Sequence, residues 1–174
     1  SIHAYSPYDF ALNSAPGSQT KFGDKDKAYI DKLFSLLNKT FVEKGIPVVI
    51  GEFAATNKDN LEERVEFAYY YSQAAGYYDI PVCWWDNGVF TPSGDSMGLI
   101  NRRTLTFVYP EIVQALLKGW YSEKEMPEED PNVWFSGTAT SSNWGQALSF
   151  YPGMDFMFED FTDGLIIAVE YTSE

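Results

Sequence analysis

Residues 46–53, with the sequence IPVVIGEF, constrain the fold more than any other stretch of this chain. A run of β-branched residues bounded by Pro47 and Gly51 is typical of a strand buried on both faces, as in a parallel sheet covered by helices. Glu52 follows at the carboxyl end of that strand. In sheets built from βα units this end carries the chemistry, so we interpret Glu52 as a functional carboxylate. Taken alone, the stretch leaves open the alternative that Glu52 only faces solvent.

Two more strand patterns, residues 1–5 and 80–85, lie on either side of this one, and helical patterns follow all three. Asp24 is a candidate N-cap for the first helix, and Asn60 with Glu63 resembles a capping box for the second. Pro110 suits the first turn of the third helix. We expect these helices to end at the glycines that follow them, namely Gly45, Gly76 and Gly119. The order predicts three consecutive βα units of an α/β fold.

Composition narrows the class of partner. The net charge of −13, from 12 basic and 25 acidic residues, disfavours nucleic acid and an anionic membrane surface. No apolar run approaches the roughly 20 residues of a spanning helix, and the first residues show no signal-peptide pattern. The lone Cys83 excludes an internal disulfide, and its place in an apolar strand predicts an inert core residue. The aromatic content of 17% fits sugar stacking or core packing.

Three short motifs at the ends of the three predicted strands carry a family resemblance. They are His3-Ala-Tyr5, Gly51-Glu52-Phe53 and Trp84-Trp85-Asp86-Asn87-Gly88. In this order they resemble the last three βα units of glycoside hydrolase family 5 enzymes of the endoglucanase and xyloglucanase type. The resemblance covers about residues 1–120 and implies the carboxyl-terminal part of a TIM (β/α)8 barrel. It also implies a secreted enzyme whose partner is a β-glucan polysaccharide, and we expect no metal ion and no cofactor.

The resemblance gives each motif residue a role. Glu52 matches the nucleophile, His3 and Tyr5 match the pair that orients it, and Trp85 matches the aromatic platform under the sugar. Trp84 and Trp85 must point to opposite faces of a strand, so at most one of them lines the site. We expect Trp84 to pack within the barrel, although the resemblance also includes it among the substrate-binding residues. Asp86 and Asn87 either bind sugar hydroxyls or form a plain turn.

One catalytic group is missing from the motifs. Retaining hydrolysis needs two carboxylates about 5 Å apart, one as nucleophile and one as acid and then base. The family carries its acid/base in an Asn-Glu-Pro motif, which this sequence lacks. Three βα units also cannot close an eight-stranded barrel. We therefore expect a part of a longer enzyme, inactive by itself, that needs the amino-terminal half of the barrel as its partner. The alternative is a non-catalytic glycan-binding or scaffold fragment.

The remainder of the chain has a different composition. Residues 122–131 are acidic and contain two prolines, which predicts an extended linker between a barrel part at 1–121 and a tail at 132–174. The tail shows short strand patterns separated by Gly and Pro, typical of an all-β, sandwich-like segment. Its pattern resembles the start of an accessory carbohydrate-binding module. Trp134 and Trp144 would then be sugar platforms, with core packing as the alternative.

Overall fold

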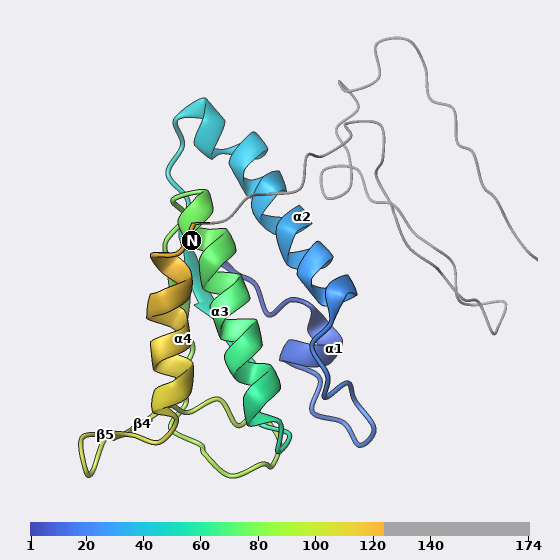
Figure 1. Ribbon diagram of the computed structural model, residues 1–174, viewed down its shortest axis with the longest axis vertical. Coiled ribbons are helices and arrows are strands. Elements are labelled where there is room, and N and C mark those ends of the chain that lie inside the picture. The colour runs from blue at the N-terminus through green and yellow to red at the C-terminus, as the bar shows by residue number, and fades with distance from the viewer. Residues whose placement is uncertain (124–174) are drawn as a thin grey trace, which may run out of the picture. The chain divides into compact units, whose positions relative to one another are not determined.

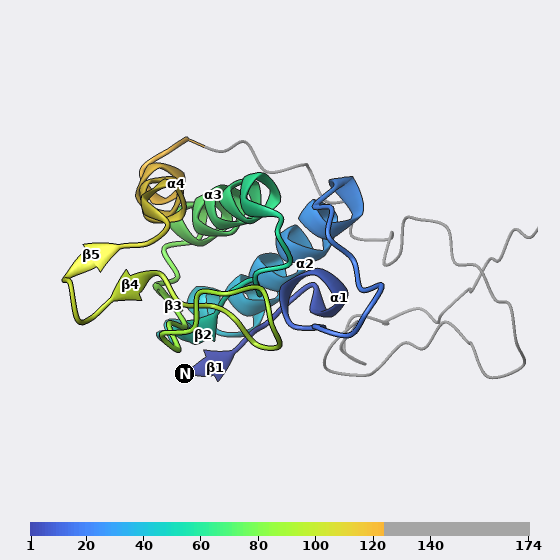
Figure 2. The ribbon, with the colours of Figure 1, turned by 90° about the horizontal axis from the view of Figure 1, so that it is seen from below.

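The computed structural model describes residues 1–123, so the predicted tail and the predicted linker beyond Glu123 lie outside the described part of the chain. The described residues form a parallel sheet in the order β1-β2-β3. Its strands are β1 (Ile2–His3), β2 (Ile50–Phe53) and β3 (Val82–Trp84). The helices α2 (Asp24–Thr40), α3 (Leu61–Tyr77) and α4 (Pro110–Trp120) lie on one side of this sheet (Figures 1 and 2). The three predicted βα units are therefore present in order.

The middle strand differs from the prediction in its position and its burial. It begins at Ile50 rather than at Pro47, and Glu52 lies inside it. Ile50 and Phe53 are fully buried on the helix side, whereas Val49 keeps 37% of its surface exposed. The expectation of burial on both faces is therefore wrong for the described residues, because helices cover only one face of the sheet.

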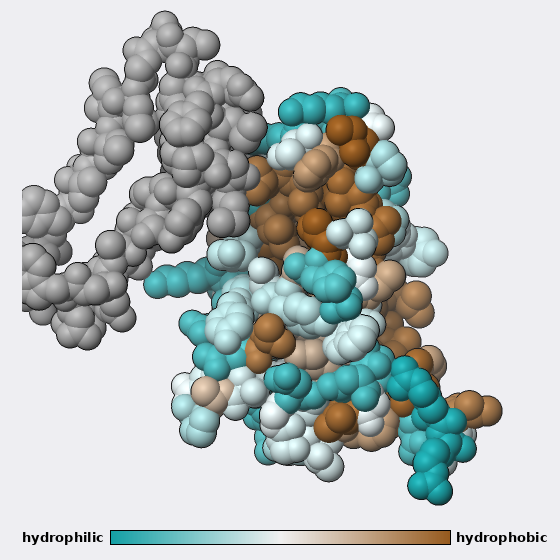
Figure 3. All heavy atoms as spheres, turned by 180° about the vertical axis from the view of Figure 1, so that it is seen from behind, coloured by the Kyte–Doolittle hydropathy of each residue, from teal (hydrophilic) through white to brown (hydrophobic). Residues whose placement is uncertain are grey.

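Cys83 shows the same effect on the neighbouring strand. The sequence places it in an apolar strand, but its side chain is exposed, so the prediction of a core cysteine is wrong. Ile46 also keeps 49% of its surface exposed. Seen from behind, the molecule presents a concentration of apolar side chains in its upper part (Figure 3). The sequence pattern correctly marks an apolar face, although in the described chain nothing packs on it.

The core between sheet and helices is largely aromatic. Phe53 of β2 stacks on Tyr71 of α3 with ring centroids 4.2 Å apart. Phe67 lies 5.4 Å from Phe10 and 5.6 Å from Phe22, which both belong to the segment between β1 and α2. Much of the aromatic excess of the sequence therefore serves the core and holds β2 against the helices.

Two glycines predicted to end helices serve another purpose. Helices α3 and α4 both continue past them, so Gly76 and Gly119 do not cap helices. A Cβ atom at Gly119 would lie 2.2 Å from the carbonyl oxygen of Tyr69, and one at Gly76 would lie 2.4 Å from that of Trp120. The absence of a side chain at these positions allows the two helix backbones to approach closely. By contrast Gly45 adopts a left-handed conformation, φ 73°, after the short 3-10 helix η1 (Val42–Lys44), as a stop signal should.

The helix starts confirm the predicted positions better than the predicted contacts. Gly23, not Asp24, is the N-cap of α2, and its N–H donates to the Asp26 carboxylate at 2.8 Å. Asn60 is the N-cap of α3, but the predicted capping box is absent. The Glu63 carboxylate instead accepts from the Phe22 N–H at 2.7 Å. That contact joins α3 to the segment before α2 across 41 positions, a tertiary interaction that the local pattern cannot reveal.

Three short elements were not predicted. Helix α1 (Tyr8–Ala11) lies in the segment after β1. The strands β4 (Ile100–Asn101) and β5 (Thr106–Phe107) form an antiparallel pair before α4.

Within residues 1–123 there is no helix with the length and apolar character that crossing a membrane requires.

Candidate active site

The carboxylate of Glu52 is the centre of the candidate site. In the pairing of β1 with β2, His3 is the register partner of Glu52, and the Ala4 N–H donates to the Glu52 carbonyl oxygen at 2.9 Å. The Tyr5 hydroxyl donates to Glu52 Oε2 at 2.8 Å, and His3 Nδ1 lies 3.2 Å from the same oxygen. Residues 3 and 5 point to the same side because side chains alternate along a strand. The expected contacts of His3 and Tyr5 with Glu52 are confirmed.

The electrostatics of this cluster favour Tyr5 as a donor. Burial, and then the hydrogen bond to Glu52 and its negative charge, raise the pKa of Tyr5 well above its usual value. The hydroxyl therefore keeps its proton at any pH at which an enzyme works. The Glu52 side chain is 23% exposed and that of His3 is 57% exposed, so solvent reaches part of this cluster.

Trp84 at the end of β3 and Trp85 directly after it lie on opposite sides, as alternation predicts. The Trp84 ring packs 5.4 Å from that of Phe53, and its Nε1 donates to the Met97 carbonyl at 2.9 Å. Trp85 is 44% exposed, and its N–H donates to the Phe53 carbonyl at 2.8 Å. Trp84 therefore packs against the core, which agrees with the packing role expected for it. A contact of Trp84 with substrate stays a prediction. The platform role of Trp85 stays a prediction, for which its exposure leaves room.

Asp86 is bound by the protein itself. Its Oδ2 accepts from the N–H groups of Leu99 at 3.1 Å and Ile100 at 2.9 Å. Its Oδ1 accepts from the Gly88 N–H at 2.8 Å and from Arg102 Nη1 at 3.1 Å. Burial of Asp86 opposes its ionisation, but these donors outweigh burial and lower the pKa of the carboxyl group. Asp86 thus joins the start of the loop that follows β3 to its end.

Asn87 binds the same loop. Its Oδ1 accepts from the N–H groups of Val89 at 3.1 Å and Met97 at 3.2 Å, and its Nδ2 donates to the Asp95 carbonyl. The structure therefore places Asp86 and Asn87 next to Trp85, with their polar atoms already engaged. A direct contact of either residue with sugar stays a prediction.

Several residues that organise the site were not singled out in the sequence. Lys58 Nζ donates to the carbonyl oxygens of Asp9 at 2.8 Å, Phe10 at 3.0 Å and Gln19 at 2.8 Å. It therefore ties the segment after β2 to the segment after β1. The only sequence signal for Lys58 was its place in the segment that follows the Gly-Glu-Phe motif.

Thr56 ties the segment after β2 to the loop after β3. Its buried hydroxyl donates to the Gly94 carbonyl at 2.9 Å and accepts from the Ser96 N–H at 3.1 Å. Asn57 adds a donation to the Phe90 carbonyl at 2.9 Å. With Lys58, these contacts link the segments that follow all three parallel strands.

Arg64 is fully buried beneath the same segments. Its Nε donates to the Ala55 carbonyl at 3.0 Å, and its guanidinium lies 4.9 Å from the centre of the Tyr109 ring. Burial lowers the pKa of Arg64 to about 10. The place of Arg64 within the predicted helix gave no sign that its side chain would be buried.

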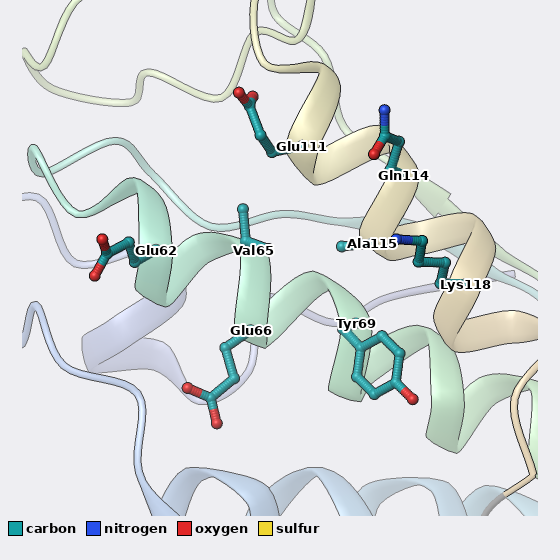
Figure 4. A pocket seen from close by; sticks show the side chains of 8 residues that line it. All are labelled: Glu62, Val65, Glu66, Tyr69, Glu111, Gln114, Ala115 and Lys118. Carbon is teal, nitrogen blue, oxygen red and sulfur yellow. The ribbon is translucent and has the colours of Figure 1, made fainter.

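A groove of about 400 Å³ lies elsewhere, between α3 and α4 (Figure 4). None of its lining residues belongs to the Glu52 cluster, and all of them come from the two helices. They are Glu62, Val65, Glu66, Tyr69, Glu111, Gln114, Ala115 and Lys118. The groove is therefore separate from the candidate site.

Comparison with known proteins gives one consistent family. The family model "Cellulase (glycosyl hydrolase family 5)" matches residues 1–91, just over half of the 174 residues. Endoglucanase B of Neocallimastix patriciarum is 45% identical over 119 residues, which is 68% of this chain and 25% of that protein. Endoglucanase 1 of Ruminococcus albus is 42% identical over 72% of this chain and 30% of that protein. The chain thus spans about a quarter to a third of these two relatives.

Solved structures agree with the sequence relatives. A broad-specificity endoglucanase from Clostridium cellulovorans matches with a TM-score of 0.67 and 56% identity, over 68% of this chain and 35% of that one. A broad-specificity endoglucanase from Ruminococcus champanellensis with bound cellotriose matches with a TM-score of 0.63 and 43% identity, over 67% of this chain and 33% of that one. The fold of residues 1–123 therefore corresponds to about a third of each of these chains.

Proposed function

Because the chain belongs to glycoside hydrolase family 5, we propose that it forms the carboxyl-terminal part of a (β/α)8 barrel that cuts β-1,4-glucan chains internally with retention of configuration. The observation that carries the proposal is the Glu52 carboxylate, held at the end of a parallel strand by Tyr5 and His3. A carboxylate fixed in this way at the mouth of a barrel suits attack on a sugar carbon.

We assign different roles to the two oxygens of the Glu52 carboxylate on the basis of their hydrogen bonds. Tyr5 and His3 both contact Oε2, so Oε1 is free of donors from residues 1–123 and is the oxygen that attacks the anomeric carbon. The glycosidic bond breaks as the new bond forms, and its oxygen leaves with a proton from the acid. Water then releases the sugar from Glu52, with that acid acting as base.

The acid/base belongs to the part of the barrel that is not in this chain. The uncovered face of the sheet supports this division, because Val49 and Cys83 are exposed there. Both side chains become interior residues when the remaining strands close the barrel. On its own the chain is expected to be inactive, because one of the two carboxylates is absent.

Trp85 is the residue proposed to bind the sugar at the cleavage site. Its 44% exposed ring can stack on the apolar face of a glucose unit. Names of relatives guide the choice of substrate: they include broad-specificity endoglucanases and a lichenase, and cellotriose and cellotetraose are bound in two complexes. We propose β-1,4-glucan and mixed-linkage glucan as the substrates to test first. We also propose that the enzyme is secreted and meets these substrates outside the cell.

A chimera tests the proposal. The full chain replaces the segment that it matches in the Clostridium cellulovorans endoglucanase, so that the rest of the barrel comes from the relative; we call this protein the completed enzyme. Hydrolysis of carboxymethyl cellulose is measured. We expect activity, and a loss of at least about a thousandfold in Glu52→Gln, because an amide cannot form the glycosyl intermediate.

The matched control is Glu66→Gln, the same change at a half-exposed position on α3, which pairs with Lys27. It should leave activity within about twofold. A folded chimera without activity would refute the proposal. So would a Glu52→Gln variant that keeps more than about a tenth of the wild-type kcat.

A further inference from the structure

We propose that Asp86 is a positioning residue, which holds the Trp85 platform in place through the loop after β3 and does not bind the sugar itself. This inference rests on the proposed function, because it assigns Trp85 to the substrate. It concerns residues whose polar atoms are already engaged within the protein.

The capacity of the carboxylate argues against a direct contact with sugar. An ionised carboxylate accepts at about four positions. Asp86 already accepts four donors, two at each oxygen: Gly88 and Arg102 at Oδ1, Leu99 and Ile100 at Oδ2. Its side chain is only 11% exposed. A sugar hydroxyl would have to displace one of these donors.

The same four donors explain how Asp86 acts on its neighbour. Leu99 and Ile100 lie at the far end of the loop, so the carboxylate closes the loop at its base directly after Trp85. Asn87 and Trp84 add further bonds from the base of the loop to Met97. The backbone of Trp85 is therefore fixed on its carboxyl side by a closed, charge-assisted ring of hydrogen bonds.

The other side of Trp85 leads to the nucleophile. Its N–H donates to the carbonyl of Phe53 at 2.8 Å, and Phe53 directly follows Glu52. One side of Trp85 is thus tied to the strand of the nucleophile, and the other side is tied by Asp86. Loss of the Asp86 anchor should move the platform relative to Glu52 while leaving the Glu52 cluster unchanged.

The two kinds of donor differ in importance. Arg102 is 60% exposed in its side chain, and a solvent-exposed ion pair contributes little. The backbone donors of Gly88, Leu99 and Ile100 cannot move away, so they form the anchor. The change Asp86→Asn attacks this anchor, because the amide turns one accepting atom into a donor that faces N–H groups.

A double-mutant cycle in the completed enzyme tests the inference, with kcat/KM measured on cellotetraose. Asp86→Asn should lower kcat/KM about tenfold, the size of one charge-assisted hydrogen bond. In the Trp85→Ala background the same change should cost less than about twofold, because the platform that it positions is gone. Retention of the full tenfold loss in that background would overturn the inference, as would an active Asp86→Asn single variant without loss.

A second pair of variants keeps the test decisive if Asp86→Asn does not fold. Arg102→Glu does more than remove a weak ion pair, because it places a like charge beside the Asp86 carboxylate while leaving the backbone donors. This repulsion should lower kcat/KM several-fold in a way that also disappears with Trp85→Ala. Arg103→Glu is the matched control, since Arg103 is exposed and does not contact Asp86; it should change nothing. Equal effects of the two reversals would contradict the proposal. Failure of the proposed function is distinct, since it appears as inactivity before any of these changes.

Discussion

Removal of the Tyr5 hydroxyl tests how the nucleophile is kept ready. In Tyr5→Phe, Glu52 Oε2 loses a donor at 2.8 Å and keeps His3 Nδ1 at 3.2 Å. A hydrogen bond to a charged group contributes about 1.5–3 kcal/mol. Because the Glu52 side chain is 23% exposed, water can replace part of the lost hydrogen bond, so the low end of this energy range applies. At about 1.4 kcal/mol per pH unit, we expect the acidic limb of the kcat/KM profile to move by about one pH unit.

The sign follows from which form the hydroxyl stabilises. A donor favours the ionised carboxylate, so its removal favours the protonated form, and the acidic limb of the kcat/KM profile moves to higher pH. The raised pKa of Tyr5 means that the wild-type hydroxyl donates over the whole profile. The assay is hydrolysis of a soluble β-glucan by the completed enzyme between about pH 4 and 8. Tyr29→Phe is the control, because Tyr29 is 55% exposed on α2. A limb that stays within about 0.3 units, or that moves to lower pH, would refute the assignment of Tyr5.

Two further predictions concern packing. Gly119→Ala should lower the Tm of the completed enzyme by several degrees, because its Cβ would meet the Tyr69 carbonyl at 2.2 Å and overpacking costs about 1–3 kcal/mol, more than the helix propensity gained; Lys118→Ala one position earlier is the control, and an unchanged Tm would show that the helices separate freely. Cys83 should react readily with a thiol reagent in the chain alone and at least about ten times more slowly in the completed enzyme, since the exposed thiol then faces the barrel interior; equal rates would mean that the remaining strands do not cover this face.

The contacts around Glu52 were predicted from the family resemblance, and the regular geometry of strands makes them possible. Alternation along a strand fixes His3 and Tyr5 on one side, and it separates Trp84 from Trp85. Parallel order then brings the ends of β1, β2 and β3 to one edge of the sheet. Neither step requires knowledge of the loops. The motif residues therefore lie where the sequence places them.

The supporting contacts could not be predicted because they join distant segments through backbone groups. Lys58 donates only to carbonyl oxygens, and Asp86 accepts three of its four bonds from backbone N–H groups, so no complementary side chain marks those bonds in the sequence. Glu63 illustrates the same limit: its local pattern predicts a capping box, but the Phe22 N–H, 41 positions away, takes the carboxylate. The Arg64 guanidinium likewise lies against the ring of Tyr109, which belongs to a distant segment of the chain.

The predictions of burial for the middle strand and for Cys83 failed for one reason. This reason also bears on how the proposed active site is divided between this chain and the rest of the barrel. Val49 and Cys83 have the apolar character of interior residues but face an uncovered side of the sheet. Glu52 and Trp85, by contrast, are held by bonds within residues 1–123. Tyr5 and the β1–β2 pairing hold Glu52, the proposed nucleophile, and the Phe53 carbonyl accepts from the N–H of Trp85, the proposed platform. Under the proposed function, completion of the barrel has to cover the apolar face and bring a second carboxylate to about 5 Å from Glu52. It does not have to build the contacts of Glu52 with His3 and Tyr5, because residues 1–123 already contain them.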